Sequence, residues 1–185
     1  MAAKPLSLQS AAAREILPGA DPFQPQWFAV YTRARHEKKI ADQLERKQLQ
    51  HFLPLYDAVH RWRDRNAEVR LPLFPGYVFV HLSVADRLQV LQMPGVVRFV
   101  TFGGHPQPLP EHQMESLRNG LACRLRMEPH PFLRVGRKVR VCRGALEGAE
   151  GILVRRKDRL RFVLSLELLM RSVAVEVDAV DIVPV

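Results

Sequence analysis

The side chains that most often perform catalysis or bind metal ions occur in this chain, but their spacing forms no pattern typical of such a site. None of the seven histidines has a second histidine four residues away, as a helical zinc site requires. Cys123 and Cys142 form no CxxC pair, which disfavours both a zinc site and a disulfide framework. No serine lies in a nucleophile elbow, and the chain has neither a P-loop nor a dinucleotide-binding motif. The sequence therefore predicts no enzyme, no metal and no cofactor.

Recognition by aromatic side chains is the chemistry that the sequence does indicate, in the stretch LPLFPGYVFV at residues 71–80. Its Pro-Gly pair favours a sharp turn, and the residues after the pair favour a strand. Because side chains alternate along a strand, Tyr77 and Phe79 face one side and Val78 and Val80 face the other. Both faces are apolar. We expect one to cover helices and the other to leave an exposed aromatic patch, which usually marks a partner site.

The stretch WFAVYTR at residues 27–33 shows the same alternation. Trp27 and Tyr31 share one predicted face with Ala29, while Phe28 lies on the opposite face. We expect Phe28 to be ordinary core, as we do for the two valines that alternate with Tyr77 and Phe79. The rings of the other face are candidates for a partner interface.

Basic residues outnumber acidic ones, with 28 Lys and Arg against 19 Asp and Glu and a formal net charge of +9. A surplus of this size favours polyanionic partners such as nucleic acid. The basic residues close to the aromatic stretches could contact phosphates without reading sequence, or could form a solvated surface. They are Arg33, Arg35, Lys38, Lys39, Arg61, Arg63 and Arg65.

The elements that would position these residues follow the order β-α-β-β-α-β-α over residues 27–120. They are a strand at 27–33, a helix at 36–50, a hairpin with arms 53–62 and 67–74, a strand at 77–82, a helix at 84–92 capped by Ser83, a strand at 96–102 and a helix at 110–119 ended by Gly120. This order predicts an α+β fold with a split-βαβ antiparallel sheet and flanking helices. We expect residues 1–26 to be a flexible extension and residues 121–134 to be an irregular linker.

Residues 135–185 have a different texture. Five short strand-like runs, separated by turn signals, predict a small SH3-like β-barrel. No apolar run approaches the length of a membrane span, and the use of cysteine favours a reducing, cytoplasmic setting. We expect a monomer with no membrane partner.

Several motifs resemble those of one known family. WFAVYTR with its following basic helix, PLFPGYVFV and GVVRFVTFGG resemble the N-terminal (NGN) domain of NusG-type transcription elongation factors. VGRKVRVCRGALEGAEGILV is similar to the KOW motif of the same family. The two halves occur in the expected order over residues 27 to 185. Details of the motifs lean toward the specialised branch typified by RfaH.

The resemblance implies that the aromatic depression binds the clamp coiled coil on the largest subunit of RNA polymerase. The positions that match this pocket are Trp27, Tyr31, Phe74, Pro75, Gly76 and Tyr77. It also implies that the basic residues named above contact upstream DNA or the displaced non-template strand. The expected outcome is suppression of pausing and termination.

In this family the KOW domain recruits ribosomal protein S10 and, in the general factor, the termination factor Rho. The matching residues here are Leu168, Leu169, Met170 and Arg171. The same stretch is rich in helix formers. The resemblance to RfaH also implies that this domain can switch to a helical form. Two alternatives stay open: a general NusG that also supports Rho, and a ribosome- or RNA-binding KOW protein with no polymerase role.

Overall fold

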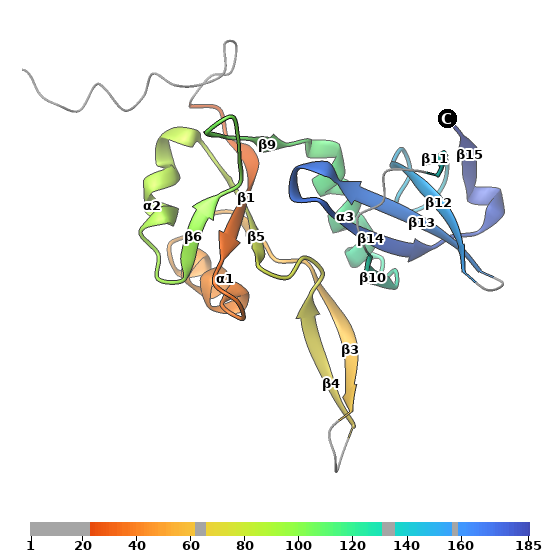
Figure 1. The fold of residues 1–185 in the computed structure, drawn as a ribbon, viewed down its shortest axis with the longest axis horizontal. Coiled ribbons are helices and arrows are strands. Elements are labelled where there is room, and N and C mark those ends of the chain that lie inside the picture. Colours follow the sequence, from red (N-terminus) through yellow and green to blue (C-terminus); the bar gives the residue numbers. More distant parts are fainter. Residues whose placement is uncertain (1–22, 62–65, 131–135, 157–158) are drawn as a thin grey trace, which may run out of the picture.

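The computed structural model describes residues 23–61, 66–130, 136–156 and 159–185 and contains two units (Figure 1). The N-terminal unit runs as far as residue 122, and the C-terminal unit begins at residue 127. The fold class predicted from the sequence is confirmed, because the first unit combines an antiparallel sheet with helices and the second is an antiparallel sheet. The predicted flexible extension lies almost entirely outside the described residues.

The N-terminal sheet is built around two central strands, and its strand order is β2-β5-β1-β6, with β9 also paired to β1. The strands are β1 (Gln26–Thr32), β2 (His51–Phe52), β5 (Tyr77–Leu82), β6 (Val96–Phe99) and β9 (Pro108–Leu109). In the antiparallel pairing of β1 with β5, Tyr31 lies opposite Tyr77 and Ala29 lies opposite Phe79. The predicted sharing of one face by these rings is therefore confirmed.

One face of this sheet is covered by two helices. Phe28, Val78 and Val80 pack there against α1 (Glu37–Arg46) and α2 (Arg87–Leu91), which follows the 3₁₀ turn η1 (Val84–Asp86). Every buried residue of this cluster lies between residues 28 and 99. The helix face is thus a core that the N-terminal unit completes by itself, as expected for these three residues.

The opposite face is covered by α3 (Glu111–Ala122), which contributes Met114 and Leu117. The sequence predicts that Gly120 stops this helix, but the helix continues to Ala122. A side chain at Gly120 would overlap Met127 and approach Leu146. The glycine therefore permits close packing of the helix against the C-terminal unit and does not terminate it.

Two hairpins project from the N-terminal unit. The longer one pairs β3 (Leu55–Arg61) with β4 (Asn66–Pro72) and extends away from both units (Figure 1). The shorter one pairs β7 (Thr101–Phe102) with β8 (His105–Pro106), in a region where the sequence predicts one longer strand followed by a loop.

The C-terminal unit is a six-stranded antiparallel sheet in the order β10-β14-β13-β12-β11-β15. The strands are β10 (Met127–His130), β11 (Arg137–Val141), β12 (Glu150–Arg156), β13 (Arg159–Leu166), β14 (Arg171–Glu176) and β15 (Ile182–Pro184), with 3₁₀ turns η2 (Glu167–Leu169) and η3 (Ala179–Asp181). The helix-prone stretch 165–171 therefore forms strand ends and a turn here. A switch to a helical form stays a prediction.

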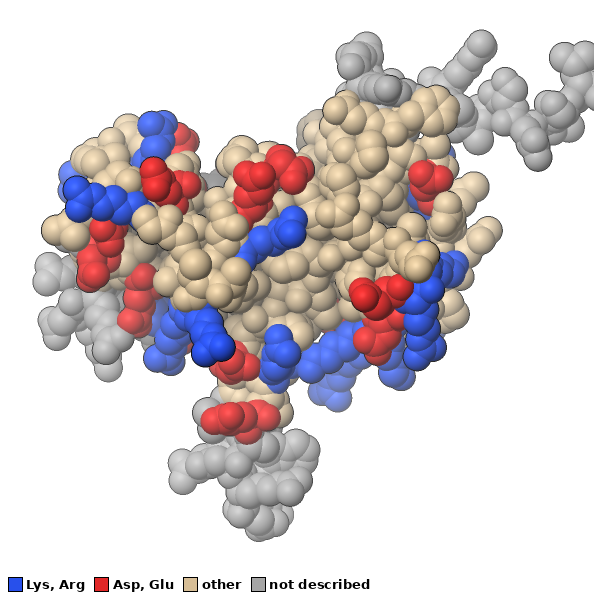
Figure 2. All heavy atoms as spheres, turned by 180° about the vertical axis from the view of Figure 1, so that it is seen from behind, with Lys and Arg blue, Asp and Glu red and all other residues tan. Residues whose placement is uncertain are grey.

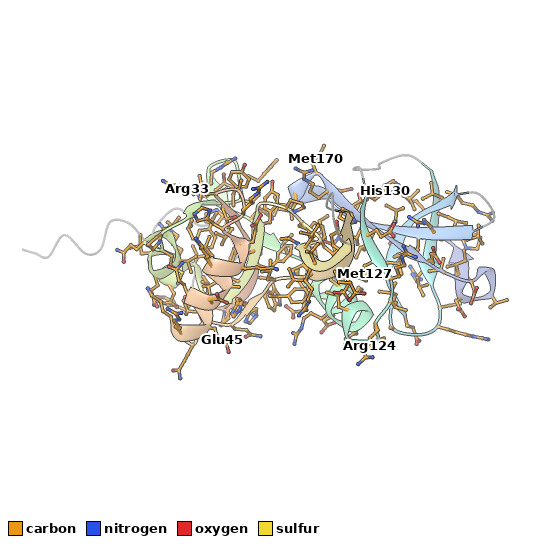
Figure 3. All side chains as sticks on the ribbon, turned by 90° about the horizontal axis from the view of Figure 1, so that it is seen from below. Arg33, Glu45, Arg124, Met127, His130 and Met170 are labelled. Carbon is orange, nitrogen blue, oxygen red and sulfur yellow. The ribbon has the colours of Figure 1, made fainter. Side chains whose placement is uncertain are left out.

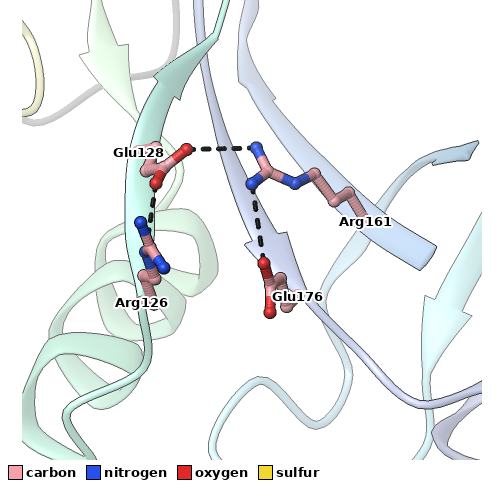
Figure 4. Close-up of polar contacts among 4 residues, drawn as sticks. All are labelled: Arg126, Glu128, Arg161 and Glu176. Atoms are coloured by element: carbon pink, nitrogen blue, oxygen red, sulfur yellow. Dashed lines mark hydrogen bonds and ion pairs between the residues drawn. The ribbon is translucent and has the colours of Figure 1, made fainter. Parts of the chain in front are cut away.

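The segment predicted to be an irregular linker is structured in part. Residues 121 and 122 complete α3, and β10 adds an edge strand beside β14. Glu128 of β10 bonds both Arg126 and Arg161, and Arg161 also pairs with Glu176 (Figure 4). Pairing with an open sheet edge and this ion-pair network stabilise the strand, and neither can be read from local propensity.

Two further differences concern helix ends. The helix predicted over 36–50 ends at Arg46, because Gln48 adopts a left-handed conformation and Leu49 N–H donates to the Leu44 carbonyl. The sequence predicts that Ser83 caps the next helix, but its side chain makes no capping hydrogen bond. Its hydroxyl instead donates to Asp86 Oδ2 over 2.7 Å.

Within the described residues, no helix is both long enough and apolar enough to cross a membrane.

Candidate functional site

The Pro-Gly pair forms a well-defined turn between β4 and β5. Tyr77 N–H donates to the Phe74 carbonyl over 3.1 Å, which closes a four-residue turn. Pro75 occupies its second position, and Gly76, with φ of +85°, occupies the third. This is the pattern of a type II turn, in which the third residue needs a positive φ that glycine adopts without strain. The sharp bend predicted from the sequence is present.

The turn is held in place from both sides. Gly76 N–H donates to Glu37 Oε1 over 2.7 Å, and Thr32 N–H donates to the Gly76 carbonyl over 2.9 Å. Glu37 is buried, so its carboxylate accepts this bond with little competition from water. A buried carboxylate at the first turn of α1 therefore fixes the backbone of the aromatic corner.

Two tyrosines form the accessible part of the corner. The rings of Tyr31 and Tyr77 lie 5.4 Å apart, and Tyr31 is 39% exposed. The Arg98 guanidinium lies 5.9 Å from the centre of the Tyr31 ring, a cation–π contact. A Cβ on Gly76 would lie 3.2 Å from the Tyr31 ring, so the glycine leaves room for that ring. Pro75 is exposed beside this pair. The result is an aromatic surface in which Tyr31 is exposed and Tyr77 is half-buried.

Trp27 and Phe74 do not share this exposure. Trp27 is 2% exposed and donates from Nε1 to Glu111 Oε1 over 3.1 Å, while Phe74 is 1% exposed and packs edge-on against Phe79. The expected open aromatic patch is therefore only partly open in this structure. Alternation placed Trp27 on the correct face, but another part of the chain covers both Trp27 and Phe74.

That cover comes from α3 and the C-terminal unit. Trp27, Phe74 and Phe79 belong to one continuous apolar cluster that also contains Met114, Leu117 and eleven buried residues of the C-terminal unit. The eleven are Met127, Val139, Val141, Leu146, Ala149, Phe162, Leu164, Leu166, Leu169, Val173 and Val175. We call the whole cluster, with its members from both units, the shared cluster. It joins the two units across the face that the helices α1 and α2 leave uncovered.

The basic residues near the corner lie at the surface. Arg33, Arg35, Lys38 and Lys39 are all exposed at the junction of β1 and α1. Arg63, Arg65 and the side chain of Arg61 lie outside the described residues. Lys and Arg side chains gather along the lower edge of the molecule, on both sides of the hairpin (Figure 2). The four described residues are thus placed where a polyanion could reach them.

The candidate contact residues of the C-terminal unit are partly buried and partly exposed, as are the aromatic rings of the corner. Leu169 is buried in the shared cluster, and Leu168 packs against that cluster. Met170 is 51% exposed, and Arg171 is also exposed. Met170 lies at the end of the C-terminal unit that points toward the N-terminal unit (Figure 3). Both candidate surfaces are therefore partly covered by the same cluster.

Comparison with known proteins identifies the family. A family model described as "Transcription termination factor nusG" matches residues 25–118. A Lactococcus lactis protein named "Transcription termination/antitermination protein NusG" is 30% identical over 171 residues, which are 84% of this chain and 91% of that protein. The chain belongs to the NusG family. It is a transcription termination/antitermination factor of that family.

A further relative agrees with this assignment, and a solved structure has a similar fold. A Rickettsia felis protein with the same name is 25% identical over 82% of this chain and 86% of its own length. The solved structure described as "Domain interaction in Thermotoga maritima NusG" has a TM-score of 0.55 and 21% identity, and the match covers 88% of this chain and 98% of that chain. The similarity to the Thermotoga maritima structure shows that the shared fold extends over both units.

Sequence reasoning missed two residues of the corner in this NusG-family chain. Glu37 stood in the predicted helix as an ordinary acidic residue, yet it bonds Gly76 across 39 positions. Arg98 stood in a predicted strand, yet it lies over Tyr31. The alternation of β6 could have suggested that Arg98 is exposed, but no local signal pairs it with Tyr31. Among the described residues, no group of histidine, cysteine and acidic side chains could hold a metal ion.

Proposed function

We propose that this protein binds RNA polymerase through its aromatic corner and suppresses pausing and termination during elongation. The proposed contact is the clamp coiled coil of the largest subunit. Binding there biases pausing only to the extent that the protein binds the elongating and paused clamp states with different affinities. The protein acts by bracing the enzyme and performs no catalysis.

The observation that carries this proposal is the pair formed by Tyr31 on β1 and Tyr77 at the end of the type II turn. Accessible tyrosine rings offer much contact area at little cost in rotamer freedom, and such rings are enriched among the residues that dominate interfaces. The two hydrogen bonds that hold Gly76 fix the backbone of the turn next to these rings before any partner arrives. A surface ordered in advance loses less entropy on binding.

We propose further that the arrangement of the two units is a closed form. The shared cluster covers Trp27 and Phe74 on one side and Leu169 on the other, so neither proposed surface is complete. Separation of the units would complete both surfaces together. The Thermotoga maritima NusG structure, which is described as showing a domain interaction, supports this view.

The remaining partners follow from the same proposal. Arg33, Arg35, Lys38 and Lys39 are exposed at the junction of β1 and α1 and would contact the phosphates of upstream DNA or the non-template strand. The Leu168–Arg171 segment would recruit ribosomal protein S10, and a general factor would use it for Rho as well.

A binding assay with purified polymerase tests the proposed corner. The double variant Tyr31→Ala and Tyr77→Ala should lose at least about tenfold in affinity, because the two central rings of an interface carry most of its binding energy. Phe74→Ala is a poor test, since a buried Phe→Ala change costs about 3–5 kcal/mol of stability.

The matched control is Val180→Ala, which alters an exposed apolar side chain of the C-terminal unit. This variant should bind polymerase like the unmodified protein. Full affinity of a folded Tyr31→Ala, Tyr77→Ala variant would remove the proposed corner from the interface. Binding of ribosomes without polymerase would favour the alternative of a ribosomal KOW protein.

A further inference from the structure

A second surface lies on the side of the hairpin that faces the C-terminal unit. A groove with a volume of about 1300 Å³ runs between the base of the β3–β4 hairpin and the end of α3 with β10. These elements lie side by side in Figure 1. None of the residues predicted above to contact polymerase, DNA or S10 lines this groove. It is therefore separate from the aromatic corner.

The groove has an apolar wall with accessible rings. Phe52 of β2 and Tyr56 of β3 line it, together with Leu121 of α3 and Leu125, which follows that helix. All four side chains are only partly buried, although each packs against the shared cluster beneath. The groove therefore has two partly accessible aromatic side chains, and the shared cluster packs beneath them.

The rim of the groove is basic. Four arginines line it (Arg70, Arg118, Arg124 and Arg126), against two acidic residues, Asp57 and Glu128. Glu128 is already engaged by Arg126 and by Arg161 of the C-terminal unit (Figure 4). Asp57 lies 3.9 Å from Arg70. Neither Arg118 nor Arg124 forms an ion pair with any described residue. Two guanidinium groups therefore remain available for an anionic ligand.

Arg124 occupies a backbone position that suits glycine better. It follows α3 with a φ of 56°, and Leu125 N–H donates to the Gly120 carbonyl over 2.9 Å. This is the helix-ending motif in which glycine usually takes the left-handed residue. An exposed arginine there adds a positive charge to the groove at some cost in backbone strain. In Figure 3 its side chain points outward from the end of α3, whereas Met127 lies inside.

We propose that this groove binds a segment of single-stranded nucleic acid. Basic side chains along a groove bind phosphates, and accessible rings stack on unpaired bases. A double helix would hide the faces of its bases from Phe52 and Tyr56, so an unpaired strand uses the apolar wall better. The interaction requires no polymerase, so its test is independent of the function proposed above.

Fluorescence anisotropy with the full-length protein tests the groove, using labelled oligouridylate and oligothymidylate of about ten nucleotides. The double variant Arg118→Ala and Arg124→Gly should bind about tenfold more weakly, and its slope of log affinity against log salt concentration should fall by about two. Arg124→Gly should leave the protein at least as stable, since it relieves the left-handed residue. Tyr56→Leu keeps the wall apolar and should weaken binding at least about fivefold with an unchanged salt slope.

The matched control removes the same charge elsewhere, with Arg137→Ala and Arg143→Ala on the exposed surface of the C-terminal unit. Comparison of the two affinities shows whether the natural ligand is RNA or DNA. Tighter binding of either oligonucleotide supports the proposed binding groove. The proposal is overturned if the control loses as much affinity as the groove variant. Equal competition by polyglutamate, or equal binding of duplex DNA with no effect of Tyr56→Leu, would also overturn it.

Discussion

The two faces of the N-terminal sheet are equally apolar in sequence but are buried in different ways. The face with Phe28 packs against α1 and α2, and every member of its cluster comes from residues 28 to 99. The face with Trp27 is completed by α3 and by residues as distant as Val175. The first face is a core in any arrangement of the units. The second face takes part of its burial from the C-terminal unit.

The largest effect should come from the self-contained face. Phe28→Ala removes a side chain that is 1% exposed, so it should lower the free energy of unfolding by about 3–5 kcal/mol. Urea denaturation followed by circular dichroism measures this loss. A change below about 1 kcal/mol would mean that this face can repack, and the contrast between the faces would fail.

A change at the contact between the units should expose the second face selectively. Leu146 is 3% exposed and lies close to Gly120 of α3. Leu146→Ser should cost about 2–4 kcal/mol, since it combines a lost apolar side chain with a buried hydroxyl. It should also loosen the C-terminal unit from α3.

Tryptophan fluorescence separates these two consequences. In a Trp62→Phe background, Trp27 is the remaining tryptophan, and its emission should shift to longer wavelength when Leu146→Ser exposes the second face. An unchanged spectrum in a folded variant would show that α3 and β9 alone bury Trp27. The second face would then be self-contained as well.

The edge of the second face, where the tyrosines stay open, can be tested through its turn. Gly76→Ala should cost about 1–2 kcal/mol, because φ is +85° and the new Cβ would lie 3.2 Å from the Tyr31 ring. Gly144→Ala is the matched control, with a φ of +84° and no heavy atom within 4 Å. The difference in melting temperature between the two variants isolates the contact with Tyr31. Equal melting temperatures would show that this ring moves aside freely.

The smallest effect should come from an ion pair that belongs to the C-terminal unit alone. The Arg140 guanidinium bonds the Glu150 carboxylate and holds the pKa of that carboxyl below its ordinary value. A lowered pKa stabilises the folded state above the ordinary carboxyl pKa, and this contribution is lost as pH falls through the lowered value. Arg140→Ala should return the Glu150 pKa upward, as an NMR titration can measure.

The same variant should leave Trp27 emission unchanged, because Arg140 and Glu150 are exposed residues outside the shared cluster. A shift in Trp27 emission would mean that the two units communicate beyond that cluster.

Local features of the fold could be predicted because their causes are local. Alternation in residues 77–82 gave the strand β5 and the correct face for each of its side chains. The Pro75-Gly76 pair gave the turn, because only a few conformations suit those two residues. Predictions failed where a distant contact decided the outcome. Gly120 stays helical because Met127 and Leu146 pack against it, and β10 forms because β14 offers an unpaired edge.

For the candidate site too, local features could be predicted and features that depend on distant contacts could not. By itself, the sequence determined which rings share a face with Tyr31, where the corner bends and which family the motifs resemble. Only the tertiary structure decided that Tyr31 is exposed and Tyr77 half-buried while Trp27 and Phe74 are covered. The reason is physical: alternation along a strand fixes the direction of a side chain, but burial depends on whatever else the chain brings to that face.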